Sequence, residues 1–215
     1  MHPADARKRV HEEINQRIER LGLRPAEVQR KAIHLGFSAV PLAIFILPAE
    51  VGEGLAAAGL IAAITIDVVR LRVPGVQAFF HRTFGTALRP HEAWELTGST
   101  YLCLAALVCI VLFIVPITVA ALLFLTVGDT MAALVGQRWG RHPLRPGKTL
   151  EGTLANLSAC VLVAVLVPGL PLAAGLVGAV VATMVELFGT AAIDDNFGIP
   201  VLSALAMWIV ASLVI

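Results

Sequence analysis

The sequence predicts an all-α membrane protein, a polytopic bundle of about seven transmembrane helices with an amphipathic helix at the membrane interface before it. Two observations predict this fold class. Of the 215 residues, 58% are hydrophobic and only 14% are charged, which is more apolar than an ordinary soluble domain. The apolar residues also fall into runs of about 17 residues or more, which is the length that crosses a bilayer as a helix.

Seven such runs are candidates for the spanning helices, and prolines punctuate most of their ends, as expected where a helix stops or restarts. The second run is short for a span. In chain order the seven candidates are Ala32–Pro48, Gly54–Val69, Thr97–Val115, Ile117–Gly136, Leu150–Val167, Leu170–Phe188 and Ile199–Ile215.

The placement of the cations predicts the orientation of these spans. All 16 Lys and Arg residues lie in three segments, namely the N-terminal segment up to Lys31, the interval Arg70–Leu96 and the interval Gln137–Thr149. The alternate intervals contain none. Because cytoplasmic loops carry the excess of Lys and Arg, we expect a cytoplasmic N-terminus and an outside C-terminus in the cell (inner) membrane.

The chain divides into a charged N-terminal segment, residues 1–29, and one transmembrane catalytic domain, residues 30–215. In the first segment Val10, Ile14, Ile18 and Leu21 recur at helical spacing among charged residues. This pattern predicts an amphipathic helix on the inner leaflet, and it fits a solvated charged helix or tail equally well.

Eight of the 15 acidic residues map to the predicted cytoplasmic ends of spans or to cytoplasmic loops. An ionised carboxylate in a membrane costs several kcal/mol unless it is paired, bound to metal or facing a wet cavity. Asp67, with Arg70 one turn later, fits a structural ion pair. Several acids at one depth instead suggest a cytoplasm-facing cavity that holds a divalent cation, and oxygen ligands favour Mg²⁺.

The stretch Gly128–Gly152 brings two acids, four cations and several glycines together between two predicted helices. Charge-assisted contacts from the cations, backbone N–H groups freed by glycine, and the start of the helix at Leu150 could all bind phosphate. A P-loop is excluded because His142 stands where its first glycine belongs, and no β-strand is expected before Gly147. The cations are Arg138, Arg141, Arg145 and Lys148.

Motifs along residues 30 to 203 resemble the integral-membrane CTP-dependent lipid kinases, the superfamily of dolichol kinase, phytol kinase and yeast-type diacylglycerol kinase. This family usually has Ser where this chain has Thr149, a change that keeps the hydroxyl. The matching motifs are Arg30-Lys31-x-x-His34, Thr97-Gly98-x-Thr100-Tyr101, Gly128-Asp129-x-x-Ala132-Ala133 followed by Gly136 and Gly140, Gly147-Lys148-Thr149-Leu150-Glu151-Gly152, and Glu186 with Asp194-Asp195-Asn196 and Pro200.

The resemblance implies transfer of the γ-phosphoryl group of CTP to the hydroxyl of a polyprenol, a phytol-like isoprenoid or a diacylglycerol, with Mg²⁺. It assigns catalysis to Asp129, Lys148 and Glu151. The nucleotide would be bound by Arg138, Arg141, Gly147, Lys148, Thr149, Gly152, Arg30, Lys31 and His34. Metal would be held by Asp129, Glu151, Asp195 and Glu186, with support from Asp67, Asp194 and Asn196. One buried acid, with Asp129 as the leading candidate, could instead be the base for the lipid hydroxyl.

Two other functions fit part of the pattern. A phosphatidate cytidylyltransferase also uses CTP, Mg²⁺ and a membrane lipid, but it would make CDP-lipid and pyrophosphate. A transporter would spread acids along its pathway, whereas the outer halves of these predicted spans carry no charge. The expected partners are a membrane lipid and a nucleoside triphosphate rather than nucleic acid, and a homo-oligomer is compatible with the sequence.

Overall fold

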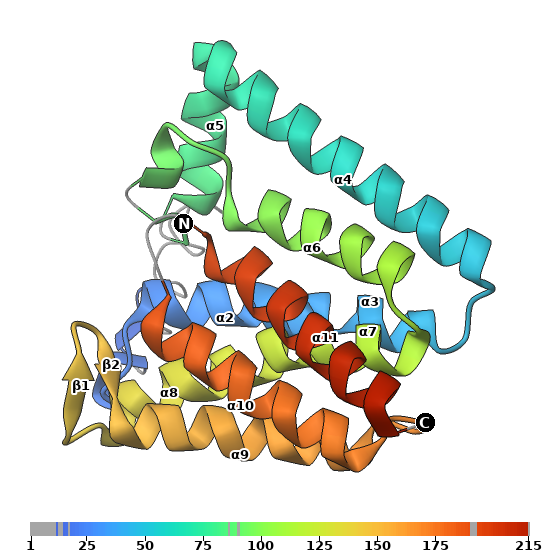
Figure 1. Cartoon of the computed structure of the whole chain (residues 1–215). Coiled ribbons are helices and arrows are strands. Elements are labelled where there is room, and N and C mark those ends of the chain that lie inside the picture. Colours follow the sequence, from blue (N-terminus) through green and yellow to red (C-terminus); the bar gives the residue numbers. More distant parts are fainter. Residues whose placement is uncertain are drawn as a thin grey trace.

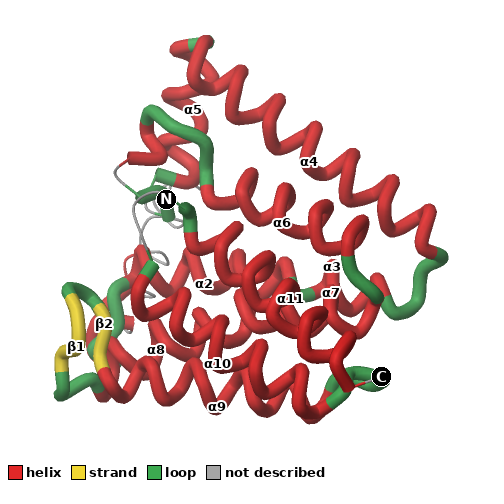
Figure 2. The backbone as a smooth tube through the Cα atoms, viewed as in Figure 1, coloured by secondary structure: helices red, strands yellow, loops and turns green. Residues whose placement is uncertain are grey.

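The computed structural model describes residues 12, 15–16, 18–85, 87–89, 91–189 and 193–214, and these are helical apart from loops and one small hairpin (Figures 1 and 2). The elements are α2 (Pro25–Phe37), α3 (Ala39–Ile44), α4 (Ala49–Arg72), α5 (Pro74–Phe84), the short η1 (His91–Ala93), α6 (Gly98–Leu112), α7 (Val115–Leu123), the π-helical η2 (Phe124–Asp129), α8 (Thr130–Trp139), β1 (Pro143–Arg145), β2 (Lys148–Thr149), α9 (Leu150–Leu166), α10 (Leu172–Phe188) and α11 (Asp195–Val214).

The core of the bundle forms around one buried rod, in which α7, η2 and α8 run continuously from Val115 to Trp139. Helix α9 packs on α8 and η2, α10 packs on α9, and α11 packs on α10, α7 and α6. Side chains such as Ile117, Phe124 and Met207 are fully buried between these helices. Apolar burial therefore holds together the part of the molecule that carries the polar residues described below.

Helix α4 lies on the outside of this bundle, where it packs against α6 and α5 (Figure 1). Its isoleucines Ile61, Ile64 and Ile66 are exposed, as suits a helix that faces lipid. Three helical stretches are long and apolar enough to cross a membrane, namely Ala49–Arg72, Val115–Trp139 and Asp195–Leu213. Helices α6, α9 and α10 are apolar but shorter, with 15, 17 and 17 residues.

The structure differs from the first of the seven predicted spans, because the residues of this span belong to two helices rather than one. Helix α2 ends at Phe37 and α3 begins at Ala39, because Pro41 has no N–H to bond the carbonyl one turn earlier. Helix α2 also crosses the predicted domain boundary after residue 29. Most of the predicted N-terminal amphipathic helix lies outside the described residues.

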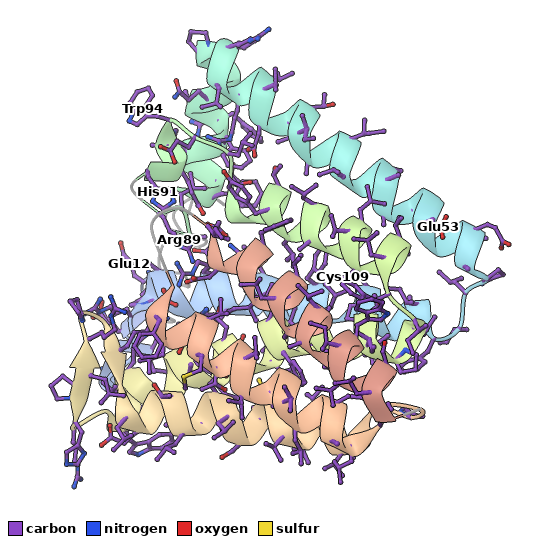
Figure 3. All side chains as sticks on the ribbon, viewed as in Figure 1. Glu12, Glu53, Arg89, His91, Trp94 and Cys109 are labelled. Carbon is purple, nitrogen blue, oxygen red and sulfur yellow. The ribbon has the colours of Figure 1, made fainter. Side chains whose placement is uncertain are left out.

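The helix ends that carry the charged residues gather at one end of the molecule. The ends of α4, α8 and α10 and the starts of α6, α9 and α11 all lie on the side of the hairpin in Figure 1. Glu53, in the first turns of α4, lies far from Arg89 and His91 (Figure 3). That this end of the molecule faces the cytoplasm stays a prediction from the distribution of Lys and Arg.

Candidate active site

Asp129 ends the π-helical turn η2 in the middle of the buried rod. Such turns widen a helix locally and are frequent at functional sites. The carboxylate of Asp129 forms an ion pair with the ammonium group of Lys31, and both side chains are buried. His34 lies one turn after Lys31, and its Nδ1 is 3.8 Å from Oδ2 of Asp129. Helix α2 therefore supplies two basic side chains to one carboxylate inside the bundle.

A tight hairpin precedes α9 and positions Lys148. Strands β1 and β2 pair with Arg145 opposite Lys148, so that Pro146 and Gly147 form the turn between them. Gly147 has a φ of +77°, a conformation that favours glycine. The ammonium group of Lys148 bonds the carboxylate of Glu186 on α10. The hairpin corrects the expectation that no strand precedes Gly147, since strands this short leave no alternating pattern to detect.

Thr149 begins α9 as its N-cap, and its hydroxyl accepts a hydrogen bond of 3.2 Å from the backbone N–H of Gly152. Glycine keeps α8 and α9 close at this point. A Cβ on Gly152 would lie 2.8 Å from the carbonyl oxygen of Ala132, and one on Gly136 would lie 3.1 Å from Oγ1 of Thr149. Both glycines are therefore needed for helix packing, in addition to any contact that they make with an anion.

These elements enclose a polar cavity of about 530 Å³, which we call the hairpin cavity. Four cations and three acids line it, and they come from the start of α2, from η2, from the hairpin and from α10. The starts of α2 and α9 also border it, so two helix N-termini add partial positive charge. The charged lining residues are Arg24, Arg30, Arg145, Lys148, Glu27, Asp129 and Glu186.

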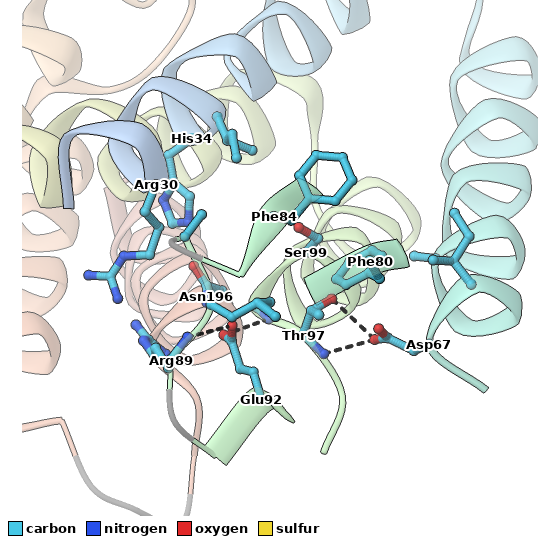
Figure 4. Close-up of a pocket in the computed structure, with 16 residues that line it drawn as sticks. Arg30, His34, Asp67, Phe80, Phe84, Arg89, Glu92, Thr97, Ser99 and Asn196 are labelled. Atoms are coloured by element: carbon cyan, nitrogen blue, oxygen red, sulfur yellow. Dashed lines mark hydrogen bonds between the residues drawn. The ribbon is translucent and has the colours of Figure 1, made fainter. Parts of the chain in front are cut away.

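A second cavity of about 300 Å³ lies beside the first, between α2, α4, α5 and the start of α6, and we call it the α5 cavity (Figure 4). Its walls include Ile66 of α4 and Phe80 and Phe84 of α5. Arg30 lines both cavities, and His34 lines the α5 cavity only 3.8 Å from Asp129 of the hairpin cavity. The two cavities therefore meet at the inner face of α2.

Four buried side-chain atoms among the described residues have no hydrogen-bond partner, and all four belong to residues that line these cavities. A buried polar atom without a partner costs roughly 1–3 kcal/mol, so such atoms cluster where a ligand can satisfy them. The atoms are Nε of Arg30, Nδ1 of His34, Oε2 of Glu186 and Oδ1 of Asn196.

The ion pair between Asp67 and Arg70 at the end of α4 differs from these four residues, because its polar side-chain atoms already have hydrogen-bond partners. Oδ1 of Asp67 accepts from Nε of Arg70 at 2.7 Å, and Oδ2 accepts from the backbone N–H and hydroxyl of Thr97 and the hydroxyl of Thr100. Arg70 also donates to the carbonyl oxygens of Glu92 and Glu95. This network joins α4 to the loop before α6, as the structural interpretation of Asp67 predicts.

Several of the other predicted site residues lie elsewhere. Arg138 and Arg141 are exposed and lie outside the lining of the hairpin cavity, and Glu151 bonds the ring of His142 at 2.7 Å on the outer side of the hairpin. Asp194 bonds Arg89 at 2.8 Å and the amide of Asn196 at 2.6 Å. In the described part of the chain, no three His, Cys, Asp or Glu side chains group so that they could hold a metal ion.

Sequence reasoning missed Arg24 and the aromatic side chains of α5. Arg24 precedes Pro25, a favoured first residue of a helix, and its backbone N–H donates to Oε1 of Gln137 at 2.9 Å. This bond holds the start of α2 against α8. The helical spacing of Phe80 and Phe84 could have predicted α5. The interval Arg70–Leu96 was instead interpreted as a polar loop, because it contains several cations.

Comparison with known proteins gives consistent matches over most of the chain. The chain is 32% identical to a phytol kinase of Synechocystis sp. over 203 residues, which cover 89% of this chain and 82% of the relative. It is 27% identical to the CTP-dependent diacylglycerol kinase 1 of Schizosaccharomyces pombe, over 86% of this chain and 93% of the relative. No protein-family model and no solved structure matches it. The chain belongs to the family of membrane lipid kinases that includes phytol kinase and the CTP-dependent diacylglycerol kinases.

Proposed function

We propose that this protein transfers the γ-phosphoryl group of CTP to the hydroxyl of a lipid alcohol, with the triphosphate in the hairpin cavity. The main support is the gathering of Arg24, Arg30, Arg145 and Lys148 around one polar cavity. Charge-assisted bonds from such cations bind phosphate oxygens, and the N-termini of α2 and α9 favour an anion there as well. CTP as the donor is supported by the relative from Schizosaccharomyces pombe, which is a CTP-dependent diacylglycerol kinase.

The residues of this cavity also fit a magnesium ion. Mg²⁺ in phosphoryl transfer takes one or two carboxylates and completes its shell with phosphate oxygens and water. Asp129 and Glu186 both line the cavity, and Oε2 of Glu186 is buried without a partner. We propose these two residues as the ligands. When bound, the metal would neutralise charge on the β- and γ-phosphates.

The reaction that we propose needs positioning more than covalent chemistry from the protein. The lipid hydroxyl oxygen attacks the γ-phosphorus, the bond from that phosphorus to the β–γ bridging oxygen breaks, and CDP leaves. Lys148 and Arg145 hold phosphate oxygens, and the carboxylate of Asp129 takes the proton of the hydroxyl. Lys31 keeps Asp129 in place through their ion pair.

Glu151 and Asp195 take a different place in this proposal from the one that the resemblance implies. Glu151 supports the hairpin through His142, and Asp195 lies beside Gly189 at the end of α10. Because neither residue lines the hairpin cavity, neither contacts the nucleotide in this proposal. We also propose that the hairpin cavity faces the cytoplasm, as the placement of Lys and Arg predicts.

The test is an assay of the purified full-length protein in lipid nanodiscs with CTP labelled at the γ-phosphate. Phytol, a polyprenol and a diacylglycerol are supplied separately, each with Mg²⁺ or with EDTA. We expect label in the lipid product of at least one alcohol, with Mg²⁺ only. Phosphatidate supplied in place of the alcohol tests the rival reaction: unlabelled CDP-lipid with labelled pyrophosphate would identify a cytidylyltransferase, and no product from any alcohol would overturn the proposal.

A further inference from the structure

The α5 cavity has an apolar wall formed by α4 and α5, polar residues such as Arg89 and Glu92 on its other side, and α4 beside it exposes an apolar face. Ile66, Phe80 and Phe84 line it, and the neighbouring Ile64 of α4 is exposed. A hydrocarbon chain could pass from the surroundings of α4 into this cavity without leaving an apolar environment. These walls suit the body of a lipid rather than a sugar or a nucleotide.

The inner end of the same cavity carries two unpartnered polar atoms, Nδ1 of His34 and Oδ1 of Asn196. His34 is 7% exposed and Asn196 is 2% exposed. The orientation of the Asn196 amide follows from chemistry: its Nδ2 faces a carboxylate oxygen of Asp194, which can only accept, so Oδ1 must point elsewhere. Figure 4 shows His34 on α2 facing Asn196 across the cavity.

A protonated ring nitrogen and an amide oxygen together match one bound hydroxyl group, which accepts from Nδ1–H of His34 and donates to Oδ1 of Asn196 until its proton passes to Asp129 in the reaction. The site for that hydroxyl lies next to Asp129, since Nδ1 of His34 is 3.8 Å from its Oδ2. Arg30 lines both cavities and could contact the transferred phosphoryl group from either side.

We propose that the α5 cavity binds the lipid acceptor, a primary hydroxyl carried on a long hydrocarbon body. His34 and Asn196 hold the hydroxyl, while Ile66, Phe80 and Phe84 hold the chain. This inference rests on the proposed kinase function, because it uses the hairpin cavity as the source of the phosphoryl group. A lipid site here also explains the position of α5 against this part of the bundle, because α5 itself has no buried residue.

The first test compares two identical substitutions on one helix. Ile66→Trp fills the α5 cavity, whereas Ile61→Trp adds the same bulk to α4 at an exposed position outside its lining. We expect Ile66→Trp to raise the KM for phytol or dioleoylglycerol by at least about tenfold with an unchanged KM for CTP. Ile61→Trp should match the parent protein. Equal KM values for the lipid in both variants would overturn the acceptor site.

The second test does not need catalysis, so it separates this inference from the proposed function. In Ile66→Cys, the rate of maleimide attachment at residue 66 is measured by mass spectrometry with and without phytol, dioleoylglycerol or CTP. We expect one of the lipids to slow attachment several-fold and CTP to leave it unchanged. Slowing by neither lipid would reject the acceptor site. Slowing by a lipid in a protein that phosphorylates no alcohol would reject the kinase proposal alone.

Discussion

Two buried acid–base networks lie at the same end of this molecule and differ in how completely they are satisfied. The polar side-chain atoms of Asp67 and Arg70 all have hydrogen-bond partners. The two residues bond each other, Asp67 also accepts from Thr97 and Thr100, and Arg70 also donates to backbone carbonyls. The pairs Lys31–Asp129 and Lys148–Glu186 border the hairpin cavity, and Oε2 of Glu186 has no partner, whereas Asp67 lines the α5 cavity with both of its carboxylate oxygens already bonded. This difference shows that a buried charge alone does not identify a functional site. A buried polar atom that has no hydrogen-bond partner and lies beside a cavity is the better indicator.

The largest effect is expected from Asp129→Asn, which removes the proposed base and one proposed metal ligand. We expect kcat to fall by about 1000-fold. The single variant also leaves the buried ammonium of Lys31 with Glu27, 3.8 Å away, as its remaining acidic partner, which costs up to about 3 kcal/mol of stability. The double variant Lys31→Met with Asp129→Asn should therefore regain thermal stability without regaining activity. Recovery of kcat in that double variant would show that Asp129 serves only to balance Lys31.

Lys148→Ala should have the next largest effect, because it removes a phosphate contact and leaves Glu186 unpaired in the same cavity. We expect kcat/KM for CTP to fall by about 100-fold, as for a lost charge-assisted bond. The matched control is Arg72→Ala, which removes an equal charge from the exposed end of α4. Steady-state kinetics on both proteins checks the prediction, and equal losses in the two variants would contradict it.

Arg145 and Arg138 give a finer comparison within one loop. Arg145 lines the hairpin cavity with its guanidinium 5.5 Å from the centre of the Phe188 ring, whereas Arg138 is exposed outside that lining. We expect Arg145→Ala to raise the KM for CTP by about tenfold and Arg138→Ala by less than about threefold. A larger rise in Arg138→Ala would favour the assignment that the family motif alone implies.

The smallest effect on the use of CTP is expected from Asp67→Asn, because Asp67 is deeply buried and lines the α5 cavity rather than the hairpin cavity. Breaking this pair should lower the thermal unfolding midpoint by about 10 °C, since a buried ion pair that loses one partner costs about 3 kcal/mol or more. The KM for CTP should change by less than about threefold at temperatures where the protein stays folded. The exposed acid at the other end of α4 gives the control Glu53→Gln, for which neither quantity should change.

Much of the helical architecture could be predicted because a membrane imposes long apolar runs with clear ends. The starts of α6, α9 and α10 lie within two residues of their predicted positions. Two short polar segments were not predicted from the sequence. The hairpin is too short to show an alternating pattern, and the cations around α5 indicated only a polar loop. The π turn at Asp129 also left no sequence signal, since it depends on how the buried rod packs on α2 and α9.

The candidate site was predicted in part. The motifs singled out Asp129, Lys148 and Glu186 as site residues, which stays a prediction, and the structure places all three around the hairpin cavity. The sequence does not predict which arginines line the cavity with these three residues, because this depends on the direction of side chains in a loop. The spacing of residues in the sequence does not give that direction. Arg24 enters the cavity only because α2 folds back against α8. The motif residues Lys31 and His34 flank Asp129 from α2, and His34 lines the neighbouring cavity.

The most direct test of the account is hydrogen–deuterium exchange of the full-length protein in nanodiscs, with and without CTP and Mg²⁺. It locates the nucleotide without relying on turnover. We expect slower exchange of backbone amides in peptides covering residues 22–31 and 145–153, and no change in those covering residues 63–72 and 96–101. Slower exchange confined to the Asp67 region, or no change anywhere at saturating CTP, would contradict the assignment of the hairpin cavity as the nucleotide site.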